Sequence, residues 1–369
     1  MRIGVPKEIK NQEYRVGLTP GAITELTHAG HSVLLETGAG EGIDVSDVEY
    51  KASGGDIARN AATVFASSDL IVKVKEPQPA ECAMLCPGQV IFTYLHLAPD
   101  PAQTKMLLAS GATAIAYETV RDSAGRLPLL APMSEVAGRL SIQVAAHYLQ
   151  KTKKGRGVLL SGVPGVEPAN VMVIGAGVAG VNATQLAVGM GARVVVVDKS
   201  VQRLREIDQL YHGRVQTMAS TREAIDYYSQ WADVIIGAVL VPGASAPKLI
   251  TRAMLSKMKR GSVLVDIAID QGGCFETSHP TTHDNPVYEV DGIIHYCVAN
   301  MPGAVPRTSA YALHNATLPY VLALANEGLE ALKRDPGFMA GLNIHHGQLT
   351  NAAVAQAQDR VFVAPETVL

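Results

Sequence analysis

The sequence predicts an α/β protein made of two Rossmann-like, doubly wound parallel-sheet domains joined by long helices. Its 369 residues exceed the size of one typical domain, so we expect two. With 47% hydrophobic and 18% charged residues, the chain has enough apolar side chains for two cores. Short apolar runs also alternate with helical segments along the chain, which is typical of parallel strands connected by right-handed crossovers.

The first series of apolar runs predicts five strands, at residues 2–6, 31–38, 70–77, 89–97 and 112–120. We expect a helix between the first two strands, over residues 19–30. Thr19 suits its N-cap, Pro20 its first helical position and Gly30 its C-terminal end.

The second series predicts six strands, at residues 170–175, 192–198, 214–219, 232–239, 262–270 and 292–301. Short helices between them fit a doubly wound sheet. Two longer helical segments, 133–150 and 308–335, lie at the junction of the two series and after the last strand. We expect these two helices to bridge the domains.

A dinucleotide-binding motif follows the first strand of the second series, with the G-x-G-x-x-G glycines at Gly175, Gly177 and Gly180. A helix-compatible segment and a strand come next, and the strand ends at Asp198, 18 residues after Gly180. Such glycines let a pyrophosphate approach the helix N-terminus, and the aspartate accepts hydrogen bonds from a ribose diol. We predict that NAD binds here. Lys199 and Arg203 weaken the exclusion of NADP, but the carboxylate is expected to dominate; a purely structural glycine-rich turn is the alternative.

Composition argues against several other classes of protein. The net charge is -3 and no Lys/Arg-rich run occurs, so nucleic acid is not an expected partner. The uncharged stretch 171–192 is long enough to span a membrane, but its glycines and polar residues argue against that interpretation. The N-terminus lacks the apolar run of a signal peptide. Four cysteines are too few for a disulfide framework, so we expect free thiols in the cytoplasm.

Candidate reacting groups lie at the predicted carboxyl ends of strands, where open α/β sheets bind ligands. Within the run 70–77, Lys75 is the last strand residue before Glu76 and Pro77 end the ladder, and its ammonium would hold a substrate carboxylate or polarise a keto oxygen. A structural role for Lys75 is equally compatible with the sequence. Lys73 is interpreted as a structural lysine that is ion-paired or extends its ammonium to the surface.

Three further groups complete the candidate set. His96, at the end of the strand 89–97, suits general acid/base catalysis, although a hydrogen-bonded core histidine is the alternative. Asp270 closes the strand 262–270, whereas Asp266 is interpreted as structural. Arg15, in the loop after the first strand, would clamp a carboxylate if it faces the ligand; otherwise it forms a surface ion pair.

Six separated motifs together resemble bacterial L-alanine dehydrogenases: RIGVPKEIKNQEYRVGLTP, VKVKEP, TYLHLAPD, APMSEVAGRLS, VMVIGAGVAG and DIAIDQGG. The resemblance runs over nearly the whole chain and weakens after about Gly341. It implies NAD-dependent, reversible oxidative deamination of L-alanine to pyruvate and ammonium. Arg15 and Lys75 would bind the substrate, His96 would be the acid/base and Asp270 would assist catalysis.

The resemblance also implies the surroundings of NAD and the organisation of the chain. The glycines above would contact NAD together with Ser134, Val178, Ala179, Asp198, Arg203, Ser220, Val239, Leu240, Ile267, Asp270, Val298, Asn300 and Met301. Residues 1–130 and 305–369 would form the substrate domain and residues 131–304 the NAD domain, with the C-terminal segment folded back onto the former. A cytoplasmic homo-hexamer is implied. No metal is expected, because the segment LANEGLEALK lacks the Glu/His pair that holds magnesium in some members.

Three alternative functions share some of these features. The NAD-binding component of a proton-translocating transhydrogenase has a similar nucleotide loop but needs no small organic substrate. A dehydrogenase of saccharopine type needs room for a larger, more acidic substrate. A non-catalytic NAD sensor would not need the cationic and imidazole groups.

Overall fold

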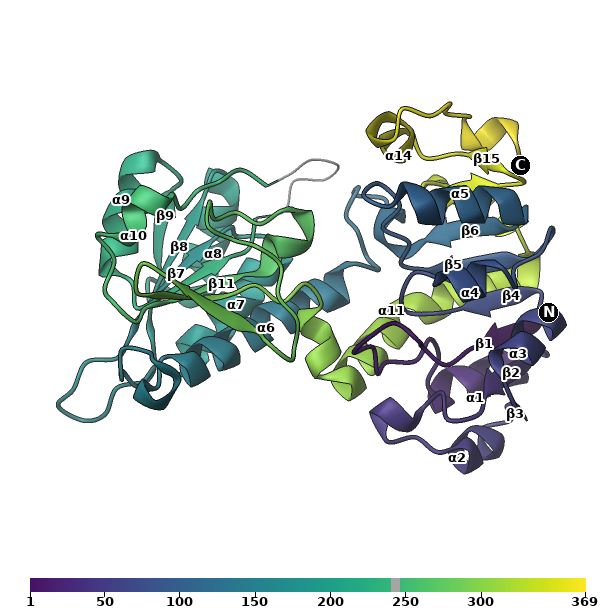
Figure 1. The fold of residues 1–369 in the computed structure, drawn as a ribbon, viewed down its shortest axis with the longest axis horizontal. Helices are drawn as coiled ribbons and strands as arrows, with labels where there is room; N and C mark the ends of the chain where they lie inside the picture. Colours follow the sequence, from purple (N-terminus) through teal and green to yellow (C-terminus); the bar gives the residue numbers. More distant parts are fainter. Residues whose placement is uncertain (240–245) are drawn as a thin grey trace. The chain divides into compact units, whose positions relative to one another are not determined.

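The structure, a computed structural model, describes residues 1–239 and 246–369. The chain divides into two compact units (Figure 1). Unit 1 comprises Met1–Pro132 and Val305–Leu369, and unit 2 comprises Met133–Ala304. The chain leaves unit 1 near the start of helix α6 (Ala131–Tyr148) and returns just before helix α11 (Pro306–Glu327).

Unit 1 is built on a mixed sheet, to which the described residues contribute eight strands: β1 (Arg2–Val5), β2 (Ser32–Glu36), β3 (Asp56–Ala58), β4 (Leu70–Val72), β5 (Val90–Thr93), β6 (Thr113–Ala116), β14 (Leu342–His345) and β15 (Gln348–Leu349). Their order is β15-β14-β6-β5-β4-β1-β2-β3. The strands β1 to β6 are parallel and follow the order 3-2-1-4-5-6 of a doubly wound fold. The C-terminal strands β14 and β15 add an antiparallel edge beside β6 (Figure 1).

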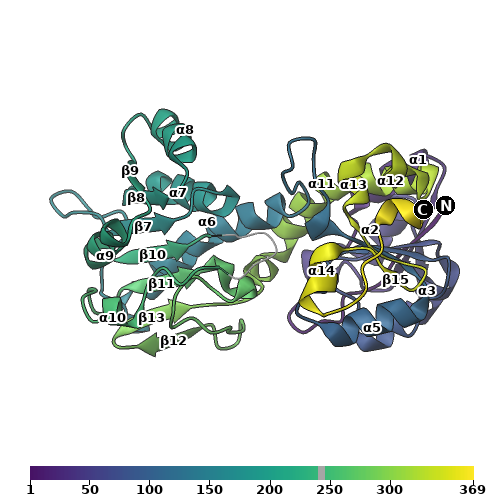
Figure 2. The same ribbon diagram turned by 90° about the horizontal axis from the view of Figure 1, so that it is seen from above.

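Helices cover both faces of this sheet, with α5 on one face and α11 on the other (Figure 2). The described helices of unit 1, besides α11, are α1 (Pro20–His28), α2 (Asp47–Ala52), α3 (Ala61–Ser67), α4 (Pro79–Cys82), α5 (Pro101–Ser110), α12 (Glu330–Arg334), α13 (Pro336–Met339) and α14 (Ala352–Ala357), with short 3-10 helices η1 (Glu41–Ile43), η2 (Tyr117–Thr119) and η6 (Pro365–Thr367). As predicted, α1 follows an extended N-cap at Thr19 and has Pro20 at its first position.

Unit 2 contains a sheet to which the described residues contribute seven strands: β7 (Asn170–Ile174), β8 (Arg193–Asp198), β9 (Gln216–Ala219), β10 (Val234–Gly237), β11 (Val263–Asp266), β12 (Val287–Val290) and β13 (Ile293–Tyr296). The order β12-β13-β11-β10-β7-β8-β9 repeats the doubly wound pattern, with β12 as an antiparallel edge strand. Besides α6, its described helices are α7 (Val178–Gly189), α8 (Val201–Tyr211), α9 (Arg222–Trp231) and α10 (Arg252–Leu255), with 3-10 helices η3 (Lys151–Lys153), η4 (Ile267–Gln271) and η5 (Met301–Ala304).

The central strand β7 shows why the strands of this sheet have nearly continuous apolar sequences. Val171 and Val173 pack into one buried cluster with residues of α7 and α8. Met172 and Ile174 pack into a second cluster with residues of α9 and α10, on the opposite face (Figure 2). A parallel strand covered on both faces has no solvent side on which polar residues would alternate.

The predicted strands were placed correctly but made too long, and the sheets are mixed rather than purely parallel. The strands β3, β12, β14 and β15 were not predicted. Apolar residues continue past the end of the ladder because the following loops are also buried, as Val74 and Leu95 show at 0% exposure. The predicted helix 308–335 ends at Glu327, where Gly328 adopts φ 61°.

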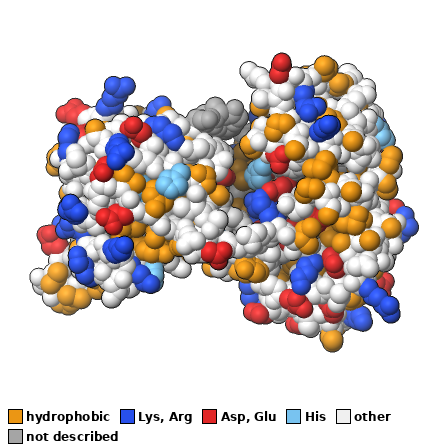
Figure 3. All heavy atoms as spheres, viewed as in Figure 1, with side chains coloured by type: hydrophobic (Ala, Val, Ile, Leu, Met, Phe, Trp, Pro, Cys, Tyr) orange, Lys and Arg blue, Asp and Glu red, His pale blue; other side chains and the backbone are white. Residues whose placement is uncertain are grey.

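The stretch 171–192 forms β7 and α7, so the membrane interpretation of it is wrong. Among the described helices, none combines the length and the apolar character needed to cross a membrane. All four cysteines are free thiols. On the face drawn in Figure 3, basic and acidic side chains are interspersed over both units, as on an ordinary mixed surface.

Candidate active site

Neighbouring strands of unit 1 end at one edge of the sheet, and a polar side chain follows each of them. Arg15 lies in the segment after β1, Lys75 in the segment after β4, and His96 in the segment after β5. The strand order reverses at β1, which pairs with β2 on one side and with β4 on the other. Doubly wound sheets bind ligands at such a switch point. The cationic residues Arg15 and Lys75 therefore follow β1 and β4, the two strands that flank the switch point.

The segment that carries Arg15 passes directly over the end of β4. A Cβ atom added to Gly17 would lie 2.5 Å from the carbonyl oxygen of Val72, a distance that side chains do not tolerate. Only glycine permits this close approach. It brings Arg15 near enough to Lys75 for the charge of Arg15 to lower the pKa of the Lys75 ammonium.

Arg15 is buried, with 2% of the residue exposed, and forms a forked ion pair with Glu13. Its Nε atom donates to Glu13 Oε1 over 2.6 Å and its Nη2 atom donates to Glu13 Oε2 over 2.5 Å. Burial alone would raise the pKa of the Glu13 carboxyl, but the hydrogen bonds and charge of Arg15 lower that pKa to about 2. The alternative of a surface ion pair is wrong, because this pair lies in the interior.

Lys75 lies three residues beyond the end of β4, so it is not the last residue of a strand as predicted. Its backbone N–H donates to Glu8 and its carbonyl accepts from Thr93. Within the part of the chain that the structure describes, its ammonium has no hydrogen-bond or ion-pair partner. Burial, and then the charge of Arg15, lower the pKa of this half-buried group. An unpaired, half-buried cation beside a second cation favours the binding of an anion.

Lys73 is fully buried, which confirms that it is an ion-paired structural lysine. Its Nζ atom donates to Glu8 over 3.0 Å and to Glu81 over 2.7 Å, and both carboxylates are buried. Glu8 also accepts from the backbone N–H of Val74 over 2.7 Å. The triad Glu8–Lys73–Glu81 therefore fixes the backbone that presents Lys75.

His96 lies outside a strand, because β5 ends at Thr93 and the residue itself adopts φ 49°. Its side chain is 38% exposed, so it is not a core histidine. The imidazole stacks on the ring of Tyr94, with 5.7 Å between ring centroids and 6° between the planes. The Tyr94 hydroxyl donates to the Leu129 carbonyl over 2.5 Å, which fixes the ring beneath the imidazole.

In unit 2, Asp270 lies in the 3-10 helix η4, because β11 ends four residues earlier at Asp266. The prediction that Asp270 closes a strand is therefore wrong. Asp270 is exposed, whereas Asp266 is buried and accepts from Cys274 N over 2.9 Å and from Ser278 Oγ over 2.6 Å. The structural interpretation of Asp266 is confirmed.

Each of the three motif positions favours glycine for a different physical reason. A Cβ on Gly180 would lie 1.7 Å from the carbonyl oxygen of Gly175, so the turn into α7 closes only with glycine there. Gly175 itself has φ 103° and lies against the Ala238 carbonyl. A Cβ on Gly177, the N-cap of α7, would meet no atom of the described residues within 4 Å. The protein leaves space at Gly177, which fits the approach of a pyrophosphate.

Asp198 is the last residue of β8, as predicted, and its carboxylate lies against the glycine loop. Oδ2 accepts from Ala176 N over 2.6 Å, and Oδ1 accepts from Ser200 N over 2.7 Å. A carboxylate offers about four acceptor positions, so this arrangement leaves room to accept from a ribose diol. The Arg203 guanidinium pairs with Glu206 over 2.8 Å, which partly neutralises the cation that favoured NADP.

The remaining candidates for nucleotide contacts lie mainly where strands of the unit 2 sheet end. Val178 and Ala179 open α7, Ser220 follows β9, and Val239 follows β10. Ile267 opens η4 after β11, and Val298, Asn300 and Met301 follow β13. Ser134 lies in the first turn of α6, and Leu240 lies outside the described residues. Their contacts with NAD stay a prediction.

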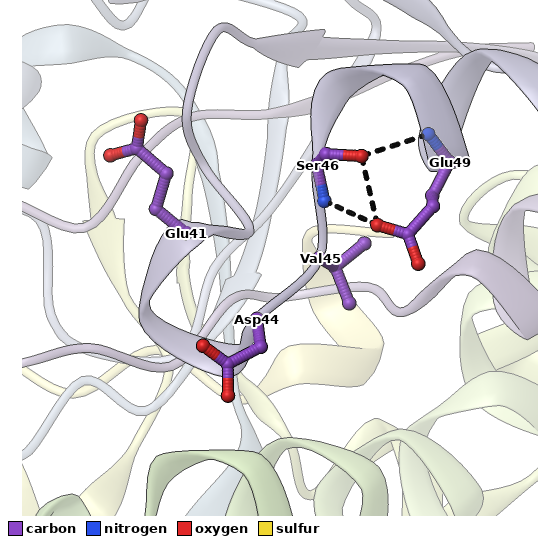
Figure 4. A pocket seen from close by; sticks show the side chains of 5 residues that line it. All are labelled: Glu41, Asp44, Val45, Ser46 and Glu49. Carbon is purple, nitrogen blue, oxygen red and sulfur yellow. Dashed lines mark hydrogen bonds between the residues drawn. The ribbon is translucent and has the colours of Figure 1, made fainter.

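Two hollows in the surface of the described residues are lined by none of these candidates. One, of about 260 Å³, is lined by Glu41, Asp44, Val45, Ser46 and Glu49 (Figure 4). Ser46 and Glu49 form the capping box of α2, so their arrangement has a local structural reason. The other, of about 340 Å³, lies in unit 2 between residues of α6 and the segment 283–296. Among the described residues, no cluster of His, Cys, Asp and Glu has the geometry of a metal site.

Sequence reasoning missed Tyr94, which supports the His96 ring, and Glu118, which holds the His96 backbone. The available indication for Glu118 was its place at the carboxyl end of the strand next to β5, the criterion that selected Lys75 and His96.

Comparisons with known proteins find family models and relatives that match nearly the whole chain. The family model "Alanine dehydrogenase/PNT, N-terminal domain" matches residues 4–137, and "Alanine dehydrogenase/PNT, C-terminal domain" matches residues 141–352. The alanine dehydrogenase of Halomonas elongata is 59% identical, and that of Mycobacterium tuberculosis 53% identical, each over 100% of both chains.

Two solved structures are similar in fold. A structure of L-alanine dehydrogenase superimposes with a TM-score of 0.94 at 50% identity, covering 97% of this chain and 99% of that one. A transhydrogenase from Sinorhizobium meliloti superimposes with a TM-score of 0.84 at 24% identity, covering 95% and 100%. At that identity the second match bears on the fold alone.

Proposed function

Because the chain belongs to the alanine dehydrogenase/PNT family, we propose that it catalyses the NAD-dependent, reversible oxidative deamination of L-alanine. The balanced reaction converts L-alanine, NAD⁺ and water to pyruvate, ammonium, NADH and a proton. The observation that carries this proposal is the half-buried Lys75 ammonium, which lies beside Arg15 and has no partner among the described residues. Such a pair of cations requires an anion, and alanine and pyruvate both supply a carboxylate.

Unit 1 is proposed to hold the amino acid. Arg15 and Lys75 would bind the carboxylate at the switch point between β1 and β4. Glu13 neutralises one of the two positive charges, so a single bound carboxylate balances the set. Two fixed donors also orient the substrate about its carboxylate, which lowers the entropy cost of reaching the reactive geometry.

His96 is proposed to be the general acid/base, with Asp270 assisting. Deamination removes a proton from the alanine amine, adds water to the iminium carbon and then protonates the departing ammonia. An imidazole accepts and returns protons near neutral pH, so it suits all three transfers. The partial exposure of the His96 side chain leaves it accessible to water.

Unit 2 is proposed to bind NAD. The open space at Gly177 and the uncapped N-terminus of α7 would receive the pyrophosphate, and Asp198 would accept from the ribose diol. When bound, the nicotinamide supplies the hydride acceptor. Asp198 would repel a 2′-phosphate, and Arg203 is already paired with Glu206, so NAD is favoured over NADP.

We also propose a cytoplasmic homo-hexamer. The free thiols support a reducing compartment, and the hexamer follows from the family resemblance. Light scattering after size-exclusion chromatography is expected to give about six times the 39.0 kDa chain mass. A monomeric or dimeric mass would contradict the hexamer without affecting the proposed reaction.

The proposed reaction is tested by following NADH absorbance at 340 nm with the purified protein, pyruvate and ammonium. Parallel reactions omit ammonium, omit pyruvate or replace NADH with NADPH. We expect consumption only when NADH, pyruvate and ammonium are all present, and chromatography should detect L-alanine in an amount equal to the NADH consumed. NADH binding without any turnover would instead favour a transhydrogenase component, which shares the fold.

A further inference from the structure

The backbone of His96 has an unusual conformation. Its φ of 49° lies in the left-handed region, which a non-glycine residue adopts only at a cost in conformational free energy. Residues held in this way cluster at functional sites, where surrounding contacts maintain them. The contact that maintains His96 is therefore of interest for the proposed reaction.

That contact is made by the Glu118 carboxylate. Glu118 lies in η2, after β6, the strand next to β5, so its side chain adjoins the segment that carries His96. A single oxygen, Oε1, accepts from His96 N over 2.6 Å and from Leu95 N over 3.2 Å. Oε2 lies 3.2 Å from Leu95 N as well. Bonds from backbone amides to a carboxylate are among the stronger hydrogen bonds in proteins.

The same carboxylate lies close to the imidazole. His96 Nδ1 is 3.9 Å from Glu118 Oε1, which is too far for a hydrogen bond. Only 16% of the Glu118 side chain is exposed, so water screens it less than a surface carboxylate. Tyr94 stacks on the ring. The backbone and the ring of His96 thus have separate supports.

We propose that Glu118 is a positioning residue for the reaction: it holds His96 in the left-handed conformation from which the imidazole transfers protons. This inference rests on the proposed function, because it assumes that His96 is the acid/base. The contrasting interpretation is that Glu118 only stabilises unit 1.

Two substitutions separate geometry from charge. Glu118→Gln keeps one carbonyl oxygen, which can accept from both amides as Oε1 does, whereas Glu118→Ala removes every acceptor.

The matched control is Asp335→Asn, because Asp335 Oδ1 likewise accepts from two successive amides, those of Gly337 and Phe338, at the start of α13. We expect Glu118→Ala to lower kcat about 10- to 100-fold with unchanged NADH affinity, a loss typical of misplaced catalytic groups. Glu118→Gln is expected to retain more activity than Glu118→Ala, and Asp335→Asn to retain the wild-type kcat.

A double-mutant cycle with His96→Ala is the deciding measurement. If Glu118 acts through His96, then Glu118→Ala changes the residual rate of the His96→Ala enzyme by no more than about twofold. An equal loss in both backgrounds, or an unchanged kcat for Glu118→Ala alone, would overturn the proposal. If Glu118→Ala fails to fold, the same cycle is run with Glu118→Gln.

The cycle also separates the two proposals. Full activity of His96→Ala would remove the acid/base assignment and the Glu118 role together. Loss of activity in His96→Ala, with additive effects of the Glu118 change, would leave the assignment intact and overturn only the positioning role.

Discussion

The Lys73 ammonium lies 2.7 Å from a carboxylate oxygen of Glu81, and neither side chain has more than 1% of its surface exposed. Glu8 is the second partner of this lysine, at 3.0 Å. The mainly apolar run 70–77 contains two lysines, Lys73 and Lys75, and their roles differ. Lys73 is neutralised inside the protein, whereas Lys75 has no ion-pair partner among the described residues.

Replacing Lys73 with methionine is expected to destabilise the protein by about 3–5 kcal/mol, because two buried carboxylates lose their counter-ion. Urea unfolding followed by circular dichroism measures the change. The control is Arg2→Met, which breaks the exposed pair with Asp69 and is expected to change the stability far less, because solvent screens that pair. Equal stabilities for the two variants would contradict the role of the buried triad.

The KM for pyruvate is expected to rise with pH, starting below the ordinary lysine pKa of 10.5. The pKa of Lys75 is lowered, so its positive charge is present at low pH and is lost earlier on raising the pH than in a free lysine. Lys75→Gln is expected to raise this KM about 10- to 100-fold and to remove the part of the pH dependence due to Lys75. The exposed Lys105→Gln serves as the control. A Lys75→Gln profile that parallels the wild type would argue against carboxylate binding by Lys75.

Acid is expected to weaken unit 1 through Glu13. The folded-state pKa of about 2 lies below the ordinary value of 4.5, so the stabilisation is complete above 4.5 and is lost as the pH falls toward 2. The shift corresponds to about 3 kcal/mol. Free energies of unfolding measured from pH 6 to pH 3 are expected to fall less steeply for Glu13→Gln. An unchanged slope would show that Glu13 is not the responsible group.

Three glycine-to-alanine variants test the nucleotide loop. Gly180→Ala is expected to abolish NADH binding and disturb the turn, because its Cβ would meet the Gly175 carbonyl at 1.7 Å. Gly177→Ala is expected to leave stability unchanged, because within residues 1–239 and 246–369 a Cβ there meets no atom closer than 4 Å, and to weaken NADH binding.

Gly189→Ala is the control, because a Cβ there also meets no atom of the described part of the chain within 4 Å and Gly189 lies in the last turn of α7. It is expected to raise stability by about 0.5–1 kcal/mol and leave NADH affinity unchanged. Calorimetric titration with NADH measures all three affinities. Equal affinities for Gly177→Ala and Gly189→Ala would contradict a close approach of the dinucleotide at Gly177.

Local sequence patterns located most of the described strands and the candidate nucleotide loop, but not β3, β12, β14 and β15. Alternating apolar runs located the strands, and the spacing from Gly180 to Asp198 located a carboxylate that lies against that loop. These features depend on residues that are near one another in the chain, so they are readable without a structure. The lengths of the strands were not readable, because buried loop residues such as Leu95 extend the apolar runs.

The tertiary structure alone decided how the candidate catalytic groups are held. The neighbouring positions of β1 and β4 bring Arg15 near Lys75, although 60 positions separate them in the chain. Glu118 reaches the backbone of His96 because β5 and β6 are adjacent. Strand order and burial arise from packing of distant segments, and both the pKa of Lys75 and the conformation of His96 depend on that packing.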